Sequence, residues 1–274
     1  MADTIIRDNL KIYFKDSRKM SEVMDESVNL IITSPPYFEY KDYGSKRQIG
    51  FGSTFEEYIE DLKLVLKEIA RVLAPDGKFC INVPNPYSHT KKEGRRFVYP
   101  LIPQITLECN KLGIDLFDEI IWVKANANAG ALNGKPLFGS YPYPTNFCIL
   151  KSMFENILVF KKLGKRQVSK SVKLKSKVTV DEWREYTKGV WFIPAIKQTS
   201  HIAMFPEELP RRLIKLYSFV DDVVLDPFLG SGTTLKAVKE LNRKGIGYEI
   251  NKDYSKIIID KIGLKNANLK DFIK

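Results

Sequence analysis

The apolar positions of this chain fall into short runs and helical repeats that alternate along the sequence. Residues 28–32 are mostly apolar and predict a buried strand, which two prolines end because neither can donate a hydrogen bond to a sheet. From residue 55 to residue 73, apolar side chains recur every three or four positions and predict a helix. Thr54 and Glu57 form a capping box at its start, and residues 75–77 are expected to end it.

Alternation of strand and helix continues through the first half of the chain and returns near its end. It predicts an α/β fold with a mostly parallel, doubly wound sheet. A polar run that ends at Met24 is helix-like, whereas residues 124–143 show no periodicity. Further strands are predicted at residues 78–83, 116–123, 156–160, 223–225 and 245–248, and further helices at residues 98–112, 206–216, 233–241 and from residue 253.

The composition indicates a globular protein without a metal centre. The 274 residues, 44% of them apolar, suffice for one large domain with an insertion. We expect a cytoplasmic location, because there is neither an apolar run long enough to cross a bilayer nor an N-terminal signal pattern. Cys80, Cys109 and Cys148 lie far apart in apolar contexts and are expected to be core thiols. His89 and His201 are the only histidines, so we expect no metal site and no metal cofactor.

The net charge of +11 favours a polyanionic partner. Eight Lys or Arg residues and no acidic residue lie between Lys161 and Lys177. This basic segment is too polar to pack, and it is either a segment that binds the polyanion or a solvated linker. The candidate contacts to the polyanion are Lys161, Lys162, Lys165 and Arg166 in this segment, and Lys91, Lys92, Arg95 and Arg96 in the loop after the strand at residues 78–83.

The first candidate site follows the strand at residues 28–32. Ser34, Pro35, Pro36 and Tyr37 bring a hydroxyl, carbonyl oxygens without competing N–H donors and an aromatic ring to the carboxyl end of a strand. Open α/β sheets bind their ligands at that end. The four residues can therefore hold a flat group with polar edges. Taken alone, they are more simply explained as a rigid turn.

A second candidate site follows the strand at residues 223–225. A glycine-containing turn leads into a helix, whose free N–H groups suit a carboxylate or a phosphate. No Lys-Ser/Thr pair follows the glycines, and Asp226 favours an ammonium group over phosphates. Glu249 ends the next strand, where acidic residues hold ribose hydroxyls in dinucleotide-binding folds. An ammonium, a carboxylate, a ribose and an adenine together describe S-adenosylmethionine.

Both stretches in this order resemble the β-type amino-methyltransferases of DNA. The resemblance rests on residues 33–37, residues 226–234 and the lead-in at residues 201–209. It implies a Rossmann-like, circularly permuted fold that uses S-adenosylmethionine. The implied organisation is a catalytic half at residues 1–124, a target-recognition region with the basic segment at residues 125–197, and a cofactor-binding half at residues 198–274.

The resemblance also implies roles for single residues. Asp226 would bind the amino group of the methionine moiety, Glu249 the ribose and Asp16 the adenine amine. Ser34 and the carbonyl oxygen of Pro35 would accept hydrogen bonds from the exocyclic amine of a flipped base, while Tyr37 stacks on that base. The other implied cofactor contacts are Thr33, Pro227, Phe228, Gly230, Gly232, Thr233 and Thr234.

Such chemistry needs no covalent enzyme nucleophile. The amine is conjugated with its ring, and two acceptors on its hydrogens draw the nitrogen toward tetrahedral geometry; methyl transfer then depends on positioning and desolvation. Carbon-5 methylation of cytosine would need a thiolate, typically after a proline. Phe79, Glu108 and Phe147 precede the three cysteines, so that chemistry is set aside.

Among the related enzymes, Ser-Pro-Pro-Tyr is typical of those acting on N4 of cytosine, whereas those acting on N6 of adenine mostly carry Asp or Asn in place of Ser34. We therefore expect an N4-cytosine methyltransferase acting on duplex DNA, with N6-adenine as the alternative. An RNA base, a protein glutamine amide and an inactive DNA-binding subunit are further alternatives. The expected partners are a cognate restriction endonuclease and a second copy of the chain.

Overall fold

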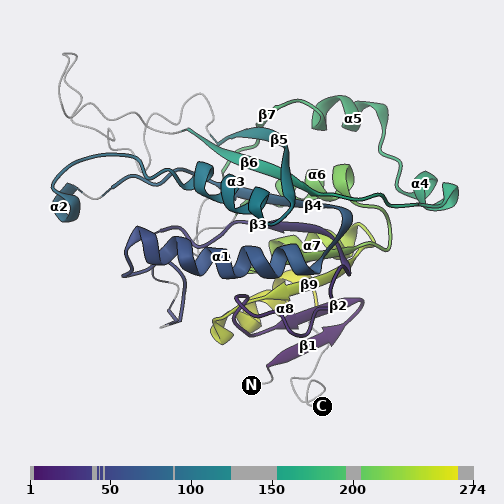
Figure 1. Ribbon diagram of the computed structural model, residues 1–274. Coiled ribbons are helices and arrows are strands. Elements are labelled where there is room, and N and C mark those ends of the chain that lie inside the picture. Colours follow the sequence, from purple (N-terminus) through teal and green to yellow (C-terminus); the bar gives the residue numbers. More distant parts are fainter. Residues whose placement is uncertain are drawn as a thin grey trace.

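The strands of this chain form one sheet with helices on both faces (Figure 1). The computed structural model describes residues 3–38, 42, 44–45, 47–88, 90–124, 153–195 and 205–264. The strands within these residues are β1 (Thr4–Arg7), β2 (Leu10–Tyr13), β3 (Val28–Thr33), β4 (Leu73–Val83), β5 (Ile114–Val123), β6 (Phe154–Lys162), β7 (Val190–Phe192), β8 (Val223–Asp226) and β9 (Lys244–Tyr248). The helices are α1 (Phe55–Val72), α2 (Thr90–Glu93), α3 (Leu101–Lys111), α4 (Lys170–Lys175), α5 (Val180–Tyr186), α6 (Glu208–Tyr217), α7 (Thr233–Glu240), α8 (Ser255–Ile262) and the short η2 (Lys252–Tyr254).

The sheet is built outward from two adjacent strands, β3 and β8, in the order β1-β2-β9-β8-β3-β4-β6-β5-β7. β3 leads through α1 to β4 on one side, and β8 leads through α7 to β9 on the other. The pairs β3–β8, β3–β4 and β8–β9 are all parallel. The chain thus leaves the carboxyl ends of β3 and β8 in opposite directions, which opens a crevice between them. The predicted α/β fold with a mostly parallel, doubly wound sheet is confirmed.

Strand β6 departs from the parallel series expected in the first half of the chain. It lies between β4 and β5 and is antiparallel to both. Its residues 157–160 are all buried, so both of its faces need cover, and a central position in the sheet provides it. β6 and β7 fall within the segment predicted as a target-recognition region, and that segment therefore contributes two strands to the main sheet.

Helix α1 shows how the sequence pattern becomes packing. The predicted capping box is present, because Thr54 Oγ1 accepts from the N–H of Glu57 and the Glu57 carboxylate accepts from the N–H of Thr54. The helix ends at Val72, earlier than predicted, because Leu73 already pairs with Val28 in the sheet. Its buried face consists of Phe55, Tyr58, Ile59, Leu62, Val65, Leu66, Ile69 and Val72.

The two faces of the sheet have separate apolar cores. Residues of α1 and α3 pack in one cluster with side chains from β3 and β4. Residues of α6, α7 and α8 pack in the other, with the opposite faces of β3, β6 and β8. Figure 1 shows α1 and α3 in front of the sheet and α6 and α7 behind it. Among the described residues, no helix is long and apolar enough to cross a bilayer.

The polar run that ends at Met24 is not helical, contrary to the prediction. Side chains of α1 form hydrogen bonds with the backbone of this run instead. Glu68 accepts from the N–H of Met20 over 2.5 Å, and Arg71 donates to the carbonyl oxygens of Met20 and Val23, both over 2.9 Å. Within the run the N–H of Val23 donates to the Met20 carbonyl over 3.0 Å, so the backbone forms turns that are held against α1.

Cys80 and Cys109 are buried and form no disulfide, which confirms them as core thiols. Burial raises the pKa of both thiols, so they stay protonated at neutral pH. Cys148 lies outside the described residues, as do His89 and His201. Within the described part of the chain, no group of three His, Cys, Asp or Glu side chains is placed to hold a metal ion.

Candidate active site

A buried carboxylate, Asp226, joins the two strands at the crevice. Thr33 Oγ1 at the end of β3 donates to Asp226 Oδ1 over 2.8 Å, and Thr234 Oγ1 in the first turn of α7 donates to Oδ2 over 2.6 Å. The backbone N–H of Phe228 also donates to Oδ1, over 3.0 Å. Asp226 thereby ties the strand that carries residues 34–37 to the helix that follows the glycine turn.

The environment of Asp226 differs from the one predicted for it. Its side chain is 1% exposed, and burial raises its pKa to about 6 although the three hydrogen bonds oppose that rise. It lies behind the residues that line the pocket, and its oxygens accept from donors of the chain itself. Its position therefore supports a structural role in joining the two loops more than a direct contact with an ammonium group.

The glycine turn between β8 and α7 is held against the end of β9. Gly230 and Gly232 have φ of 53° and 90°, in the left-handed region that glycine adopts without strain. Glu249, directly after β9, accepts from the N–H groups of Gly230 and Asn251 over 2.9 and 2.8 Å. Burial raises the pKa of Glu249 to about 7, while the two N–H groups lower it. Unlike Asp226, the Glu249 carboxylate reaches the pocket wall.

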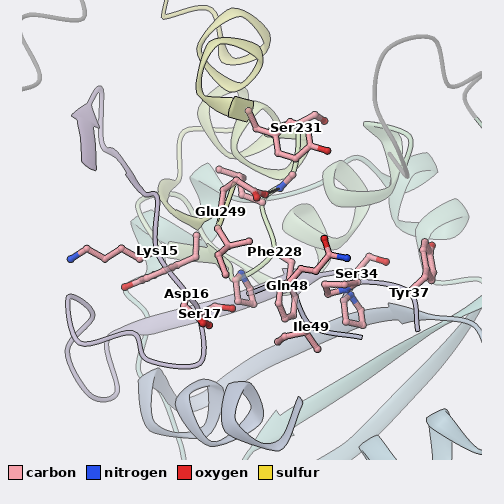
Figure 2. Close-up of a pocket in the computed structure, with 18 of the residues that line it drawn as sticks. Lys15, Asp16, Ser17, Ser34, Tyr37, Gln48, Ile49, Phe228, Ser231 and Glu249 are labelled. Carbon is pink, nitrogen blue, oxygen red and sulfur yellow. Dashed lines mark hydrogen bonds between the residues drawn. The ribbon is translucent and has the colours of Figure 1, made fainter. Parts of the chain in front are cut away.

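One pocket collects residues from both candidate sites. Figure 2 shows Ser34 and Tyr37 on one side of it, Asp16 and Ser17 on the other, and Ser231 and Glu249 above them. The open space between these residues, its mouth to the solvent included, is about 970 Å³. The predicted residues on its wall are Asp16, Ser34, Pro35, Pro36, Tyr37, Pro227, Phe228, Gly230, Thr233 and Glu249. The predicted residues behind the wall are Thr33, Asp226, Gly232 and Thr234.

The turn after β3 is fixed by hydrogen bonds from two neighbouring elements. Ser34 Oγ donates to the carbonyl oxygen of Asn82 near the end of β4, over 3.1 Å. Tyr58 in α1 donates its hydroxyl to the carbonyl oxygen of Pro36 over 2.9 Å. Because the Ser34 proton points to β4, the lone pairs of its oxygen are left to accept from another group. A serine held in this way acts as a hydrogen-bond acceptor toward the pocket.

The sequence profile of a family described as DNA methylase, of the N6/N4 type, matches residues 28–260. The chain belongs to this family. It is 34% identical to the type II methyltransferase M.MjaI of Methanocaldococcus jannaschii, over 98% of this chain and 96% of that protein. It is 27% identical to the type II methyltransferase M.SmaI of Serratia marcescens, over 92% of this chain and 90% of that protein. The predicted family is confirmed.

The fold of this DNA methylase is similar to those of solved structures. A Thermus thermophilus protein crystallised with S-adenosyl-L-methionine is 30% identical and superposes with a TM-score of 0.75, over 93% of each chain. The PvuII DNA methyltransferase is only 20% identical and shares the fold, with a TM-score of 0.67 over 96% of this chain and 90% of that one. The predicted methyltransferase fold is confirmed.

Asp16 lies on the pocket wall of the methylase next to an arginine. Arg18 Nη2 donates to Asp16 Oδ2 over 2.6 Å, and Arg18 Nη1 donates to Asp61 of α1 over 2.6 Å. Burial works against ionisation of Asp16, but Arg18 outweighs it and holds the pKa of Asp16 below its usual range. An ionised Asp16 can accept from an amine, so its position is compatible with the predicted adenine contact.

Several pocket residues, Ser17 and Ile49 among them, were not predicted from the sequence, and three more residues act from behind the pocket of this methylase. Lys261 of α8 donates to Ser231 Oγ over 2.9 Å and to Thr233 Oγ1 over 2.6 Å, which places a cation beside the start of α7. Asn82 and Glu155, from β4 and β6, lie directly behind the Ser34–Tyr37 turn. None of the three stands in a local motif, because each reaches the site from an element distant in sequence.

The two predicted groups of DNA-binding residues lie at opposite ends of the sheet. β4 pairs with β6 so that Lys78, in the middle of β4, faces Lys161, and Val83 at the carboxyl end of β4 faces Asn156. Figure 1 shows α2 and α4 at opposite ends of the molecule. Lys161 pairs with Asp76, and so the segment from Lys161 to α4 starts at the edge away from the pocket.

The group in the loop after β4 is close to the Ser34–Tyr37 turn, which we name the catalytic turn after its predicted role. It contains α2, with Lys91 and Lys92, and it leads to the exposed Arg95 and Arg96. The loop is anchored through Tyr99, whose ring packs against Phe38, one residue beyond the turn, with ring centroids 5.2 Å apart. This contact holds the loop beside Ser34–Tyr37. Lys162 donates to the carbonyls of Ala70 and Leu73, and Arg166 pairs with Asp222, so the position of the first group lends no support to a DNA-binding role.

The burial of Glu249 has a consequence for stability. Its pKa is raised from 4.5 to about 7 in the folded chain, so between these values the folded state binds more protons and loses stability as pH rises. We expect Glu249→Gln to weaken this dependence, by up to about 3 kcal/mol between pH 5 and pH 8. Urea unfolding of parent and variant at both pH values, without cofactor, measures it. Equal pH dependence of the two proteins would show that Glu249 titrates normally.

Proposed function

We propose that this DNA methylase transfers a methyl group from S-adenosylmethionine to the exocyclic N4 amine of cytosine in duplex DNA. The observation that carries the proposal is the hydrogen bond from Ser34 Oγ to the carbonyl oxygen of Asn82. It turns the serine proton away and presents lone pairs where the predicted chemistry needs an acceptor for an amine hydrogen. Pro35 and Tyr37 line the same end of the pocket.

The pocket residues offer partners for the ribose, the adenine and the carboxylate of S-adenosylmethionine. Glu249 offers carboxylate oxygens for two ribose hydroxyls, and Asp16 offers an acceptor for the adenine amine. Ser231 and Thr233 accept from Lys261 and share a hydrogen bond between their hydroxyls over 3.3 Å, so one of their two protons is left to be donated to the carboxylate of the methionine end. The ammonium of Lys261 adds a positive charge behind these hydroxyls, and Gly230 lets the backbone approach closely. When bound, the sulfonium of the cofactor supplies the methyl group.

The residues of the chain act on the amine mainly by position. Ser34 Oγ and the Pro35 carbonyl accept its two hydrogens and draw the nitrogen out of conjugation with the ring. Tyr37 stacks on the flipped base and offsets part of the unstacking cost. The apolar wall formed by Ile49, Phe228 and their neighbours excludes water from the reacting atoms.

The choice of cytosine N4 rests on the serine itself. Enzymes of the related group that act on adenine N6 mostly carry Asp or Asn in place of Ser34, whereas Ser-Pro-Pro-Tyr is typical of those acting on cytosine N4. A neutral hydroxyl is also a weaker acceptor than a carboxylate. Adenine N6 in duplex DNA is the second candidate, because the same serine lone pairs can accept from either amine.

Duplex DNA is the proposed partner on grounds of charge and kinship. The net charge of +11 and the exposed Arg95 and Arg96 beside the catalytic turn suit a phosphate backbone. M.MjaI and M.SmaI, to which the chain is similar over nearly its whole length, are type II methyltransferases. The proposed biological role is therefore modification of the site cut by a cognate restriction endonuclease, in the cytoplasm.

Product analysis tests the proposed function. Duplex DNA incubated with the protein and S-adenosylmethionine is digested to nucleosides, and mass spectrometry is expected to find N4-methylcytosine. RNA of the same base composition is the matched control and should stay unmodified. N6-methyladenine without N4-methylcytosine would overturn the choice of base and leave DNA as the substrate. Methylation of RNA alone would overturn the choice of DNA.

A further inference from the structure

Glu155 is a buried carboxylate behind the catalytic turn for which the mechanism above has no use. It lies near the start of β6, at the carboxyl edge of the sheet, and its side chain is 8% exposed. Three donors converge on it. Asn82 Nδ2 donates to Oε2 over 2.6 Å, the Tyr37 hydroxyl donates to Oε1 over 3.3 Å, and the ammonium of Lys124 pairs with Oε1.

Two of these donors belong to the group that holds the amine. The Tyr37 ring is the proposed stacking platform, and its hydroxyl is held at one end by Glu155. Asn82 is 2% exposed, and its backbone carbonyl accepts the Ser34 proton. Glu155 fixes the side chain of that same asparagine. One carboxylate therefore contacts, directly or through one residue, both parts of the proposed grip on the base.

The charge of Glu155 is suited to this position. A buried carboxylate is costly unless it is paired and hydrogen-bonded, and Lys124 supplies the opposite charge. Because a carboxylate only accepts, it can hold hydroxyl, amide and ammonium donors at once. A glutamine of the same shape has one acceptor oxygen and turns an NH₂ group toward donors. It removes the negative charge that pairs with Lys124, and it can keep Asn82 as a partner only if that side chain turns its amide around.

We propose that Glu155 is the positioning residue of the methyl-acceptor site, holding Tyr37 and Asn82, and through Asn82 the Ser34 hydroxyl, in the geometry that receives the amine. This inference rests on the proposed function of Ser34 and Tyr37. Glu155 touches neither the base nor the cofactor in this assignment. Its effect is confined to the transfer step, because the cofactor side of the pocket is built from residues that follow β2, β8 and β9.

The test compares Glu155→Gln with the parent in single-turnover transfer of a radiolabelled methyl group to unmethylated duplex DNA. We expect the transfer rate to fall about 10- to 100-fold, the cost of a small misplacement of reacting groups. The dissociation constant of S-adenosylmethionine, measured by calorimetry, should stay within about twofold of the parent. Glu119→Gln, an exposed carboxylate on the neighbouring β5, is the matched control and should transfer at the parent rate.

A double-mutant cycle separates positioning from a merely structural ion pair. Tyr37→Phe keeps the ring and removes only the hydroxyl that Glu155 accepts, and we expect a several-fold slower transfer. In the Glu155→Gln background, adding Tyr37→Phe should lower the transfer rate much less than it does in the parent. The two changes remove one shared contact, so the second has little left to remove. Should Glu155→Gln not fold, Tyr37→Phe still decides, since parent-like transfer by it would overturn the proposal.

The outcomes of this experiment are distinct. A parent that binds the cofactor but transfers no methyl group to DNA would overturn the proposed function itself. An active parent matched by Glu155→Gln would overturn only the role of Glu155. The role of Glu155 would also be overturned if Glu155→Gln were slow but its cofactor affinity or thermal stability fell in proportion. The same conclusion would follow if the effects of the two substitutions on the transfer rate multiplied in the double variant.

Discussion

Replacing Ser34 by alanine is expected to reduce methyl transfer by about 100- to 1,000-fold while leaving the pocket otherwise intact. The substitution removes the oxygen whose lone pairs face the amine, and alanine fits the space of serine without strain. The single hydrogen bond lost inside the chain, to the Asn82 carbonyl, costs only about 1 kcal/mol of stability. Rapid-quench measurement of one turnover on duplex DNA reports the transfer step directly.

The matched control is Ser171→Ala, in the exposed helix α4, which should behave as the parent. Affinity for S-adenosylmethionine and for duplex DNA should be unchanged in Ser34→Ala, because this residue meets neither the methionine end nor the phosphates. If Ser34→Ala transferred at the parent rate, the acceptor of the amine hydrogen would have to be another group in the pocket.

Replacing Asp226 by alanine is expected to lower both stability and cofactor affinity. The side chain accepts from Thr33, Thr234 and the N–H of Phe228, and all three donors would be left without it in the interior. We expect a loss of roughly 2–4 kcal/mol in the free energy of unfolding. Cofactor affinity should fall more than tenfold, because the glycine turn loses its link to β3. Urea unfolding and calorimetric titration measure the two effects.

Asp226→Asn is the matched variant, since it keeps the size and one acceptor oxygen. We expect its effects to be intermediate, because an amide can accept from one threonine but presents a donor to the other. A stable Asp226→Ala protein with weakened cofactor binding would restore the direct ammonium contact predicted from the sequence. Parent-like values for both quantities would contradict either role.

Local patterns predicted the catalytic turn and the glycine turn because each is contiguous. Residues 33–37 and 226–234 each combine a strand end, prolines or glycines, and a few polar side chains within a short stretch. Their chemistry can therefore be predicted from the sequence without knowledge of the fold. Eight of the ten predicted residues that line the pocket come from these two stretches, and the other two are Asp16 and Glu249. The sequence could not predict which of these side chains face the pocket. Asp226 shows why, because the same carboxylate can face a ligand or the interior, depending on the neighbouring strand.

The role of Glu155 and the position of the basic segment could not be predicted for a related reason. The contact between Tyr37 and Glu155 spans 118 residues and depends on the place of β6 in the sheet, which periodicity does not reveal. Lys161 and Lys162 were assigned to DNA by their charge alone. The charge of a residue does not tell where in the fold it lies. The antiparallel course of β6 places these two lysines away from the pocket, where they bind Asp76 and carbonyl oxygens at the end of α1.

The central place of β3 affects how the chain can fold as it is made. β3 lies between β4, which follows soon after it, and β8, which is synthesised about 190 residues later. Until β8 leaves the ribosome, one edge of β3 and the Thr33 hydroxyl have no native partner. Closing so long a loop is slow, so the pocket is completed only at the end of synthesis. A nascent chain would thus carry the catalytic turn for many seconds before it could bind a cofactor.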